Sequence, residues 1–262
     1  MAEISKIQWT GATWNPFVGC EKVSAGCKFC YAERFIEGRF QQDFRTVKRT
    51  KDPTFYLPIK LSKKFTGDEP FNERLVFTCS LSDFFIKQGD GVRWQLWQMI
   101  RETPNLIYQI LTKRPERILQ NLPDDWGAGY QNVWLGTSTE DQKTFDERVQ
   151  ILAQVPARVR FLSIEPILWP IDVEGSISKI DWVIIGGESG GKNQFRPASL
   201  SWLEQIVSSC RSADVPVFVK QLGAHLAKEI GSKDFHGGQI DEFPESIRVR
   251  QWPKIYSDEE KK

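Results

Sequence analysis

The sequence has no run of about 18 consecutive apolar residues, the length that a membrane-spanning helix needs. Its opening residues, MAEISKIQWTG, also lack the apolar core of a secretory signal peptide. Both absences argue against a membrane protein and against a secreted protein. We therefore expect a cytoplasmic protein that contacts no membrane.

An excess of charge of either sign is also missing. The formal net charge of the 262 residues is +1, which excludes a global field that would draw the chain to nucleic acid or to a membrane surface. With 40% hydrophobic and 26% charged residues, the composition is that of an ordinary globular protein. The length is sufficient for one large α/β barrel.

Short apolar runs alternate with helix-like stretches along the chain. The candidate strands are Thr13–Val18, Leu75–Cys79, Leu106–Leu111, Val133–Gly136, Val159–Ser163, Trp182–Gly186 and Val215–Val219. The clearest helices are Asp90–Glu102, Thr139–Gln154 and Ser199–Ala213. The alternation predicts an α/β fold with a partial parallel (β/α) barrel of six or seven strands in residues 1–231. Residues 232–262 are expected to form an irregular extension that packs on the barrel and ends in a frayed tip.

Polar side chains gather where each candidate strand ends. They are Cys20, Ser80–Asp83, Thr112–Arg114, Thr137–Glu140, Glu165, Glu188 and Lys220–Gln221. The carboxyl ends of parallel barrel strands meet on one face, which is where active sites lie in such barrels. Polar residues also end strands for purely structural reasons, but agreement among seven strands favours a shared site.

Histidine is scarce, whereas three of the five cysteines crowd into the spacing C-x6-C-x2-C as Cys20, Cys27 and Cys30. Disulfides are rare in a reducing compartment, so this spacing indicates a metal site. Three thiolates without a fourth ligand nearby favour an iron–sulfur cubane with one open iron over a structural zinc site, which takes four ligands. Two alternatives remain, namely a zinc site closed by Cys79 and three ordinary buried cysteines. Cys210 falls on a predicted helix and is expected in the core.

The cysteine spacing resembles the signature of radical S-adenosylmethionine enzymes, with Phe29 as the aromatic residue between the last two cysteines and the usual C-x3-C-x2-C stretched. The chain as a whole resembles a phage-associated, radical-SAM-like family of unassigned function from bacteriophages and bacteria. The matching stretches are Gln8–Thr10, Ala12–Pro16, Gly19–Arg34, Ser80–Phe84, Leu111–Pro115, Asn132–Gly136, Phe161–Pro166, Asp181–Gly190 and Val219–Gly223.

The resemblance implies a [4Fe–4S] cluster on Cys20, Cys27 and Cys30, with S-adenosyl-L-methionine on the open iron. Reduction of the cluster by an electron donor would cleave this cofactor to a 5′-deoxyadenosyl radical, which takes hydrogen from a substrate. The activity of the family is not established, so the resemblance gives the cofactor class and not the reaction.

The resemblance also implies which side chains contact the cofactor. Phe29 is expected near the adenine, and Ser80, Ser82 and Asp83 near the methionine amino group. Ser138 and Glu140 are candidates for the ribose hydroxyls, although the serines could simply cap strand or helix ends. Lys113 and Arg114 could hold the cofactor carboxylate or a substrate phosphate, or could be surface charge where Pro115 starts a helix.

Three further charged residues at strand ends are candidates for catalysis. Glu165, Glu188 and Lys220 could bind or deprotonate a substrate, and structural ion pairing would explain the same residues without chemistry. Between Arg39 and Lys64 the sequence has eight Lys and Arg but only two Asp, a local excess of +6. This segment is the expected contact for a nucleic acid or nucleotide substrate, and a solvated face is the alternative.

Besides the radical enzyme, the sequence permits two other functions. One is a non-catalytic interaction module with zinc or a structural iron–sulfur cluster. The other is a barrel that keeps the shape of the family without its cofactor.

Overall fold

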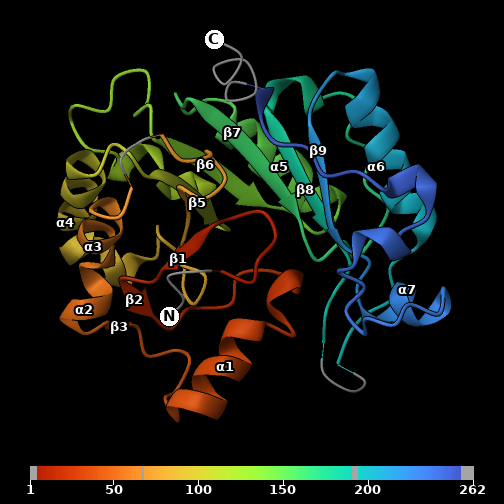
Figure 1. Cartoon of the computed structure of the whole chain (residues 1–262), viewed down its shortest axis with the longest axis horizontal. Helices are drawn as coiled ribbons and strands as arrows, with labels where there is room; N and C mark the ends of the chain where they lie inside the picture. Colours follow the sequence, from red (N-terminus) through yellow and green to blue (C-terminus); the bar gives the residue numbers. More distant parts are fainter. Residues whose placement is uncertain (1–4, 66–67, 191–193, 255–262) are drawn as a thin grey trace. The chain divides into compact units, whose positions relative to one another are not determined.

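A computed structural model describes residues 5–65, 68–190 and 194–254. Its main sheet has seven strands in the order β1-β4-β5-β6-β7-β8-β9 (Figure 1). Neighbouring strands pair in parallel at β1–β4, β4–β5, β7–β8 and β8–β9. The expected α/β fold of a partial parallel barrel is therefore confirmed, with seven strands. They are β1 (Ala12–Trp14), β4 (Leu75–Thr78), β5 (Ile107–Thr112), β6 (Val133–Ser138), β7 (Val159–Ile164), β8 (Trp182–Gly186) and β9 (Val217–Gln221).

The strands are buried along nearly their whole length. All residues of β4, β6 and β8 are buried, which explains why these runs are almost continuously apolar instead of alternating. A helix follows most strands, as parallel connections require. These helices are α4 (Asp90–Glu102), α5 (Gln142–Leu152), α6 (Leu200–Ser212) and α7 (Ala224–Glu229).

The first predicted strand, Thr13–Val18, is wrong as a single strand. The structure divides it into β1 and β2 (Phe17–Val18), and β2 pairs antiparallel with β3 (Lys48–Arg49) in a separate sheet. The break falls at Asn15 and Pro16. Proline has no N–H to donate to the ladder, and the Asn15 side chain accepts a hydrogen bond from Leu81 N at 2.7 Å. A side chain engaged in this way replaces strand pairing at the turn.

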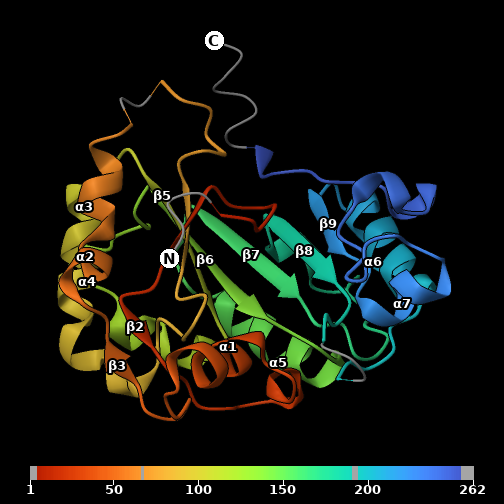
Figure 2. The same ribbon diagram turned by 60° about the horizontal axis from the view of Figure 1, so that its bottom comes forward.

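The chain divides into two compact units. The first unit comprises Met1–Val23, Cys30–Gly136 and Val155–Arg158. It holds β1 to β5 and the helices α1 (Tyr31–Phe40), α2 (Asp52–Phe55), α3 (Leu57–Ser62) and α4. The helices α2, α3 and α4 lie together in this unit (Figures 1 and 2).

The second unit comprises Ser24–Phe29, Thr137–Gln154 and Val159–Lys262. In it, α6 packs against β8 and β9 (Figure 1). From Ser232 onward the described chain contains two short 3-10 turns, Ile240–Glu242 and Glu245–Ile247, and an isolated antiparallel bridge between Arg250 and Phe218. This stretch contacts β9, where the Arg250 guanidinium donates to the carbonyl of Val219 at 3.1 Å. The tip that was expected to be frayed begins at residue 255 and lies outside the described residues.

No helix in the described residues combines the length and the apolar character that crossing a membrane requires.

Candidate functional site

The three clustered cysteines lie on the segment Gly19–Cys30, which we call the cysteine segment. Their side chains are all partly exposed, and none of the five cysteines of the chain forms a disulfide. The segment begins with a tight approach to the backbone of the first unit. Gly19 has φ +97°, and a Cβ there would lie 2.4 Å from the carbonyl oxygen of Thr46. Only glycine fits this position without strain.

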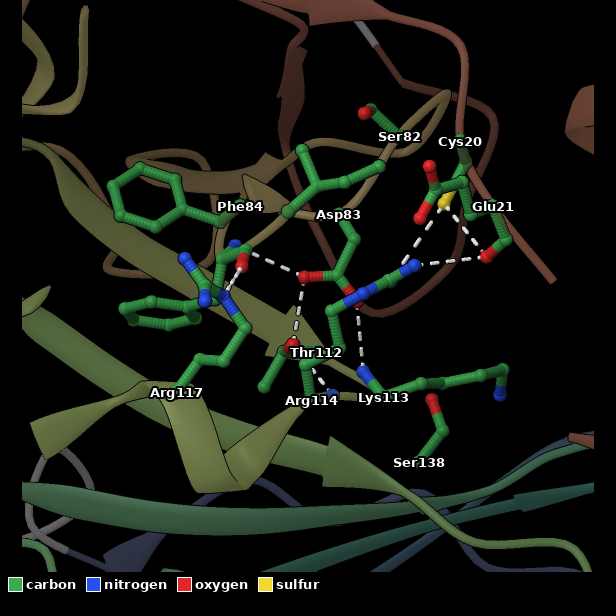
Figure 3. Close-up of polar contacts among 12 residues, drawn as sticks. Cys20, Glu21, Ser82, Asp83, Phe84, Thr112, Lys113, Arg114, Arg117 and Ser138 are labelled. Atoms are coloured by element: carbon green, nitrogen blue, oxygen red, sulfur yellow. Dashed lines mark hydrogen bonds and ion pairs between the residues drawn. The ribbon is translucent and has the colours of Figure 1, made fainter. Parts of the chain in front are cut away.

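The first part of the cysteine segment is held by two side chains of the first unit. Ser82 Oγ donates to the Gly19 carbonyl at 2.6 Å. Arg114 Nη2 donates to the Glu21 carbonyl at 2.9 Å, and its Nη1 lies 3.8 Å from Cys20 Sγ (Figure 3). We call this arrangement, with the Asp83 carboxylate behind Arg114, the first grip.

Asp83 orients Arg114 within the first grip. Oδ1 of Asp83 accepts hydrogen bonds from Phe85 N at 2.9 Å and Thr112 Oγ1 at 2.7 Å. Its Oδ2 accepts from Lys113 N at 2.9 Å and from Arg114 Nη1 at 3.0 Å (Figure 3). A carboxylate has about four acceptor sites, so these four donors occupy it fully. A ligand ammonium could bind Asp83 only by displacing one of them.

The charge on Arg114 is secure despite its burial. Burial by itself lowers the pKa of Arg114, but the Asp83 carboxylate and Cys20 outweigh that effect and raise this pKa above its usual value. The group is therefore a permanent cation beside a sulfur atom. Such a cation favours the thiolate form, which is the form that binds metals.

The later part of the cysteine segment, Ser24–Phe29, belongs to the second unit and is held by other residues of that unit. The buried Glu140 carboxylate accepts a hydrogen bond from Gly26 N at 3.1 Å and another from Arg148 Nη1 at 3.1 Å. A Cβ on Gly26 would lie 3.1 Å from the carboxyl carbon of Glu140. A side chain at this position would therefore push on the glutamate that holds the turn.

A second buried glutamate acts on the same turn through an arginine. Glu188 accepts from Arg196 N at 2.8 Å and from Arg196 Nε at 2.9 Å. Nη1 of Arg196 donates to the Ala25 carbonyl at 2.9 Å, and its guanidinium lies 5.5 Å from the centre of the Phe29 ring. Glu140 and the Glu188–Arg196 pair together form the second grip.

Two of the three cysteines pack against the same group of apolar side chains. Cys20 and Cys30 both pack against a small apolar cluster in the first unit that includes Val18, Ile36 and Leu81. Cys27 ends the 3-10 turn Ala25–Cys27. Among the described residues, no group of three or more His, Cys, Asp or Glu side chains is placed so that it could hold a metal ion. Three partly exposed thiols are donors that suit an iron–sulfur cluster or zinc. The three sulfur atoms are not preassembled around a common metal position.

The other two cysteines differ from these three. Burial, followed by the charges of Asp83 and Cys20, raises the pKa of Cys79 well above its usual value. Burial raises the pKa of Cys210 to about 12. Both side chains are held as neutral thiols, which do not bind metals until they lose a proton.

The comparison with protein families gives one match. The chain belongs to the DUF5131 family. The model of this family, described as a protein of unknown function, matches residues 4–249. The chain matches no curated protein and no solved structure.

The three catalytic candidates of this DUF5131 member separate into two places. Lys220 forms an ion pair with Glu165, and both side chains are about four-fifths buried. Gly186 lies beside them, since a Cβ there would be 3.2 Å from Gln221 Cγ and 3.6 Å from Glu165 Cδ. Glu188 belongs to the second grip instead and has Arg196 as its partner.

The remaining predicted residues have varied surroundings. Ser80 Oγ accepts from Asn15 Nδ2 at 2.9 Å, and the Ser80 carbonyl accepts from the Tyr31 hydroxyl. The Ser138 carbonyl accepts from Arg148 Nη1 at 2.7 Å. The partly exposed Lys113 ammonium has no hydrogen-bond or ion-pair partner in the part of the chain that the structure describes (Figure 3). These placements leave the predicted cofactor contacts as predictions.

Sequence reasoning missed two of the arginines that hold the cysteine segment. Arg148 gives a signal, because it falls within the buried stripe of α5 beside Phe145, Val149 and Leu152, where an arginine requires a buried partner. Arg196 gives no such signal, since the sequence around it shows no helical or strand periodicity. Its role follows only from the fold.

Proposed function

We propose that this protein is a radical S-adenosylmethionine enzyme in which Cys20, Cys27 and Cys30 hold a [4Fe–4S] cluster. The observation that carries the proposal is that buried ion pairs hold the cysteine segment. Asp83–Arg114 and Glu140–Arg148 are both nearly or fully buried ion pairs. Buried pairs seldom add net stability, so their use to hold a short loop of partly exposed thiols supports a functional role for that loop.

The residues of the chain have distinct parts in this proposal. Arg114 favours the thiolate of Cys20, and Lys113, whose ammonium has no partner among the described residues, offers a cation for the cofactor carboxylate. Phe29 offers a ring face for the adenine, while Ser80, Ser82, Asp83, Ser138 and Glu140 shape the surroundings of the cofactor. When bound, the cluster and S-adenosyl-L-methionine would supply a 5′-deoxyadenosyl radical after reduction by an electron donor.

The Glu165–Lys220 pair is the proposed place for handling a substrate proton, because a partly buried carboxylate–ammonium pair can exchange one. Glu188 supports the second grip and acts by positioning. The substrate we propose is a nucleic acid or nucleotide that contacts the exposed basic segment Arg39–Lys64. We further propose that the DUF5131 family is a radical-SAM-like family with phage members. The motifs around the cysteines support this proposal.

The decisive experiment is anaerobic purification followed by reconstitution with iron and sulfide. The proposal predicts about four iron atoms per chain and a brown chromophore. It also predicts 5′-deoxyadenosine when the protein is incubated with S-adenosylmethionine and dithionite. Cys30→Ala should lose iron and product, whereas Cys210→Ala, which removes a buried thiol from α6, should keep both.

Two results would count against the proposal. A colourless protein with one zinc per chain supports the non-catalytic metal-binding module instead. A fully loaded cluster that never yields 5′-deoxyadenosine supports a fold that has lost the chemistry.

A further inference from the structure

Positive charge is concentrated on one exposed stretch of the first unit. All eight Lys and Arg between Arg39 and Lys64 are exposed. The rest of the chain carries 27 Lys and Arg against 32 Asp and Glu, a net charge of −5. A stretch of +6 on a chain that is otherwise acidic attracts polyanions locally and repels them elsewhere.

Exposed aromatic rings are concentrated in the same region. Seven aromatic side chains are exposed in the described part of the chain, and four of them lie between residues 31 and 56. These four are Tyr31, Phe35, Phe40 and Tyr56, which are 37–50% exposed. Large exposed apolar side chains that gather in one region of a chain favour a binding surface over a purely structural role.

The cations and the rings are interleaved. The guanidinium of Arg39 lies 5.5 Å from the centre of the Phe35 ring, and Phe35 meets Phe40 edge to face at 5.3 Å. The guanidinium of Arg49 lies 5.7 Å from the centre of the Tyr56 ring. Ring faces for stacking therefore alternate with cations for phosphates, which is the composition of surfaces that bind single strands.

This surface adjoins the cysteine segment within the first unit. Cys20 N donates to the Phe44 carbonyl at 2.8 Å, on the connection between α1 and β3. Tyr31 follows Cys30 directly in the sequence. Val18 of β2, the strand that pairs with β3, packs with Ile36 of α1 in one apolar cluster. A strand bound along α1 and β3 would pass close to Cys20.

We propose that α1, β3 and α2 form a binding surface for single-stranded nucleic acid. Unpaired bases stack on Phe35, Phe40 and Tyr56, while Arg45, Lys48 and Lys51 contact phosphates. The surface discriminates against duplexes, because paired bases are already stacked and present no free face to the rings. This inference rests on the proposed function for the choice of a nucleic acid as substrate, and it specifies the strand state that the surface accepts.

The test is fluorescence anisotropy on the full-length protein without added S-adenosylmethionine. The probes are labelled oligothymidine and oligouridine of about 16 nucleotides and a hairpin duplex of equal charge. The single strands should bind at least tenfold more tightly than the hairpin. The relative affinity of the DNA and RNA probes identifies the preferred sugar.

Two sets of variants separate stacking from charge. Phe35→Ala and Tyr56→Ala should each weaken binding of the single strands by about tenfold, whereas Trp94→Ala, which removes a more exposed ring on α4, should not. Phe35→Leu and Tyr56→Leu keep apolar bulk and should also weaken binding. Binding is also measured at several salt concentrations, and the salt slope is the slope of log affinity against log salt concentration. The triple variant Arg45→Gln/Lys48→Gln/Lys51→Gln should reduce the magnitude of this slope by about 2. The matched control is Lys143→Gln/Arg211→Gln/Lys228→Gln, which removes three exposed cations of the second unit.

Equal affinity for the hairpin and the single strands overturns the inference, as does unchanged binding in the aromatic variants. A salt slope that falls equally in both triple variants also overturns it. The assay requires no cluster, so the two proposals fail separately. Binding by a protein that never acquires iron contradicts only the radical enzyme, and an iron-loaded protein that binds no strand contradicts only the surface.

Discussion

The two grips hold neighbouring parts of one segment in different ways. The first grip reaches a sulfur atom, because Arg114 Nη1 lies 3.8 Å from Cys20 Sγ. The second grip meets only backbone atoms and a ring, through Gly26 N, the Ala25 carbonyl and Phe29. The first grip can therefore alter the chemistry of a thiol, whereas the second sets only its position.

The Asp83–Arg114 pair of the first grip is also more buried than the Glu188–Arg196 pair of the second, although the Glu140–Arg148 pair of the second grip is buried to the same degree as the first. The side chains of Arg114 and Asp83 are 8% and 6% exposed, whereas Arg196, the partner of Glu188, is 18% exposed. Water can partly replace a lost partner in the second pair and hardly at all in the first. The comparison teaches that one loop can be fixed both by a buried ion pair that contacts a cysteine sulfur and by a more hydrated pair that contacts the backbone.

The largest expected difference comes from removing each acid. Asp83→Ala leaves a buried guanidinium without its counter-charge and should lower the free energy of unfolding by about 3–5 kcal/mol. Glu188→Ala should cost less, about 1–3 kcal/mol, because Arg196 gains water. Urea unfolding of the two variants measures both values. Asp125→Ala, in an exposed pair with Arg101, is the control and should change little. Equal losses for Asp83→Ala and Glu188→Ala would contradict the comparison.

The glycines offer a second contrast. Gly19→Ala places a Cβ against backbone at positive φ, so we expect a loss of about 2 kcal/mol or more. Gly26→Ala meets the end of the Glu140 side chain, which can move, and should cost less than about 1 kcal/mol. Thermal unfolding followed by circular dichroism compares them. A larger loss for Gly26→Ala would show that the second grip is the more rigid one.

Cys210, which neither grip contacts, is a reference for how burial alone changes the pKa of a thiol in this chain. Because burial raises the pKa of Cys210 to about 12, the folded chain keeps this proton at pH values where the unfolded chain loses it, above about 8.5. The unfolded state then binds fewer protons, so stability is retained below that pH and falls as the pH rises toward 12. Between pH 8 and 10 this fall amounts to about 2 kcal/mol.

Urea unfolding at pH 8 and pH 10 measures the fall, and Cys210→Ala should reduce it by that amount. An identical pH dependence in the wild type and in Cys210→Ala would show that this thiol is not shielded.

The smallest effect concerns the sulfur itself. Arg114→Met should slow the alkylation of Cys20 by iodoacetamide several-fold, because the cation that favours the thiolate is gone. Arg114→Lys should retain most of the rate, and Arg196→Met should leave Cys20 unaffected. Peptide mapping by mass spectrometry measures the modification of Cys20 and Cys27 separately. If Arg114→Met and Arg196→Met slow Cys20 equally, the first grip has no special relation to the sulfur.

Much of the fold was predictable from the sequence because it depends on local patterns. The helix Asp90–Glu102 was predicted with its observed bounds, since its apolar stripe and the following Pro104 mark both ends. The prediction for α5 began too early at Thr139, because the capping box of Asp141 and Thr144 starts the helix at Gln142. The seven parallel strands followed from buried apolar runs.

The candidate site was less predictable because it depends on partners distant in the sequence. Asp83 and Glu140 were expected beside a cofactor, and Glu188 was a candidate for catalysis. The structure shows that they also fasten the cysteine segment, through Arg114, directly at Gly26, and through Arg196. Which arginine meets a buried carboxylate depends on tertiary contacts, and no spacing rule gives it. The spacing of the cysteines was visible at once, whereas the means of holding them was not.

The α5 helix sets a limit on insertions and deletions. Glu140 precedes the Asp141 cap, and Arg148 lies on the helix itself, so the number of residues between them determines which side chain faces Glu140. One added residue between positions 142 and 147 rotates all that follows by about 100°. Glu147 would then take the place of Arg148 and set two carboxylates against each other. The count of residues in this stretch is therefore as constrained as their identity.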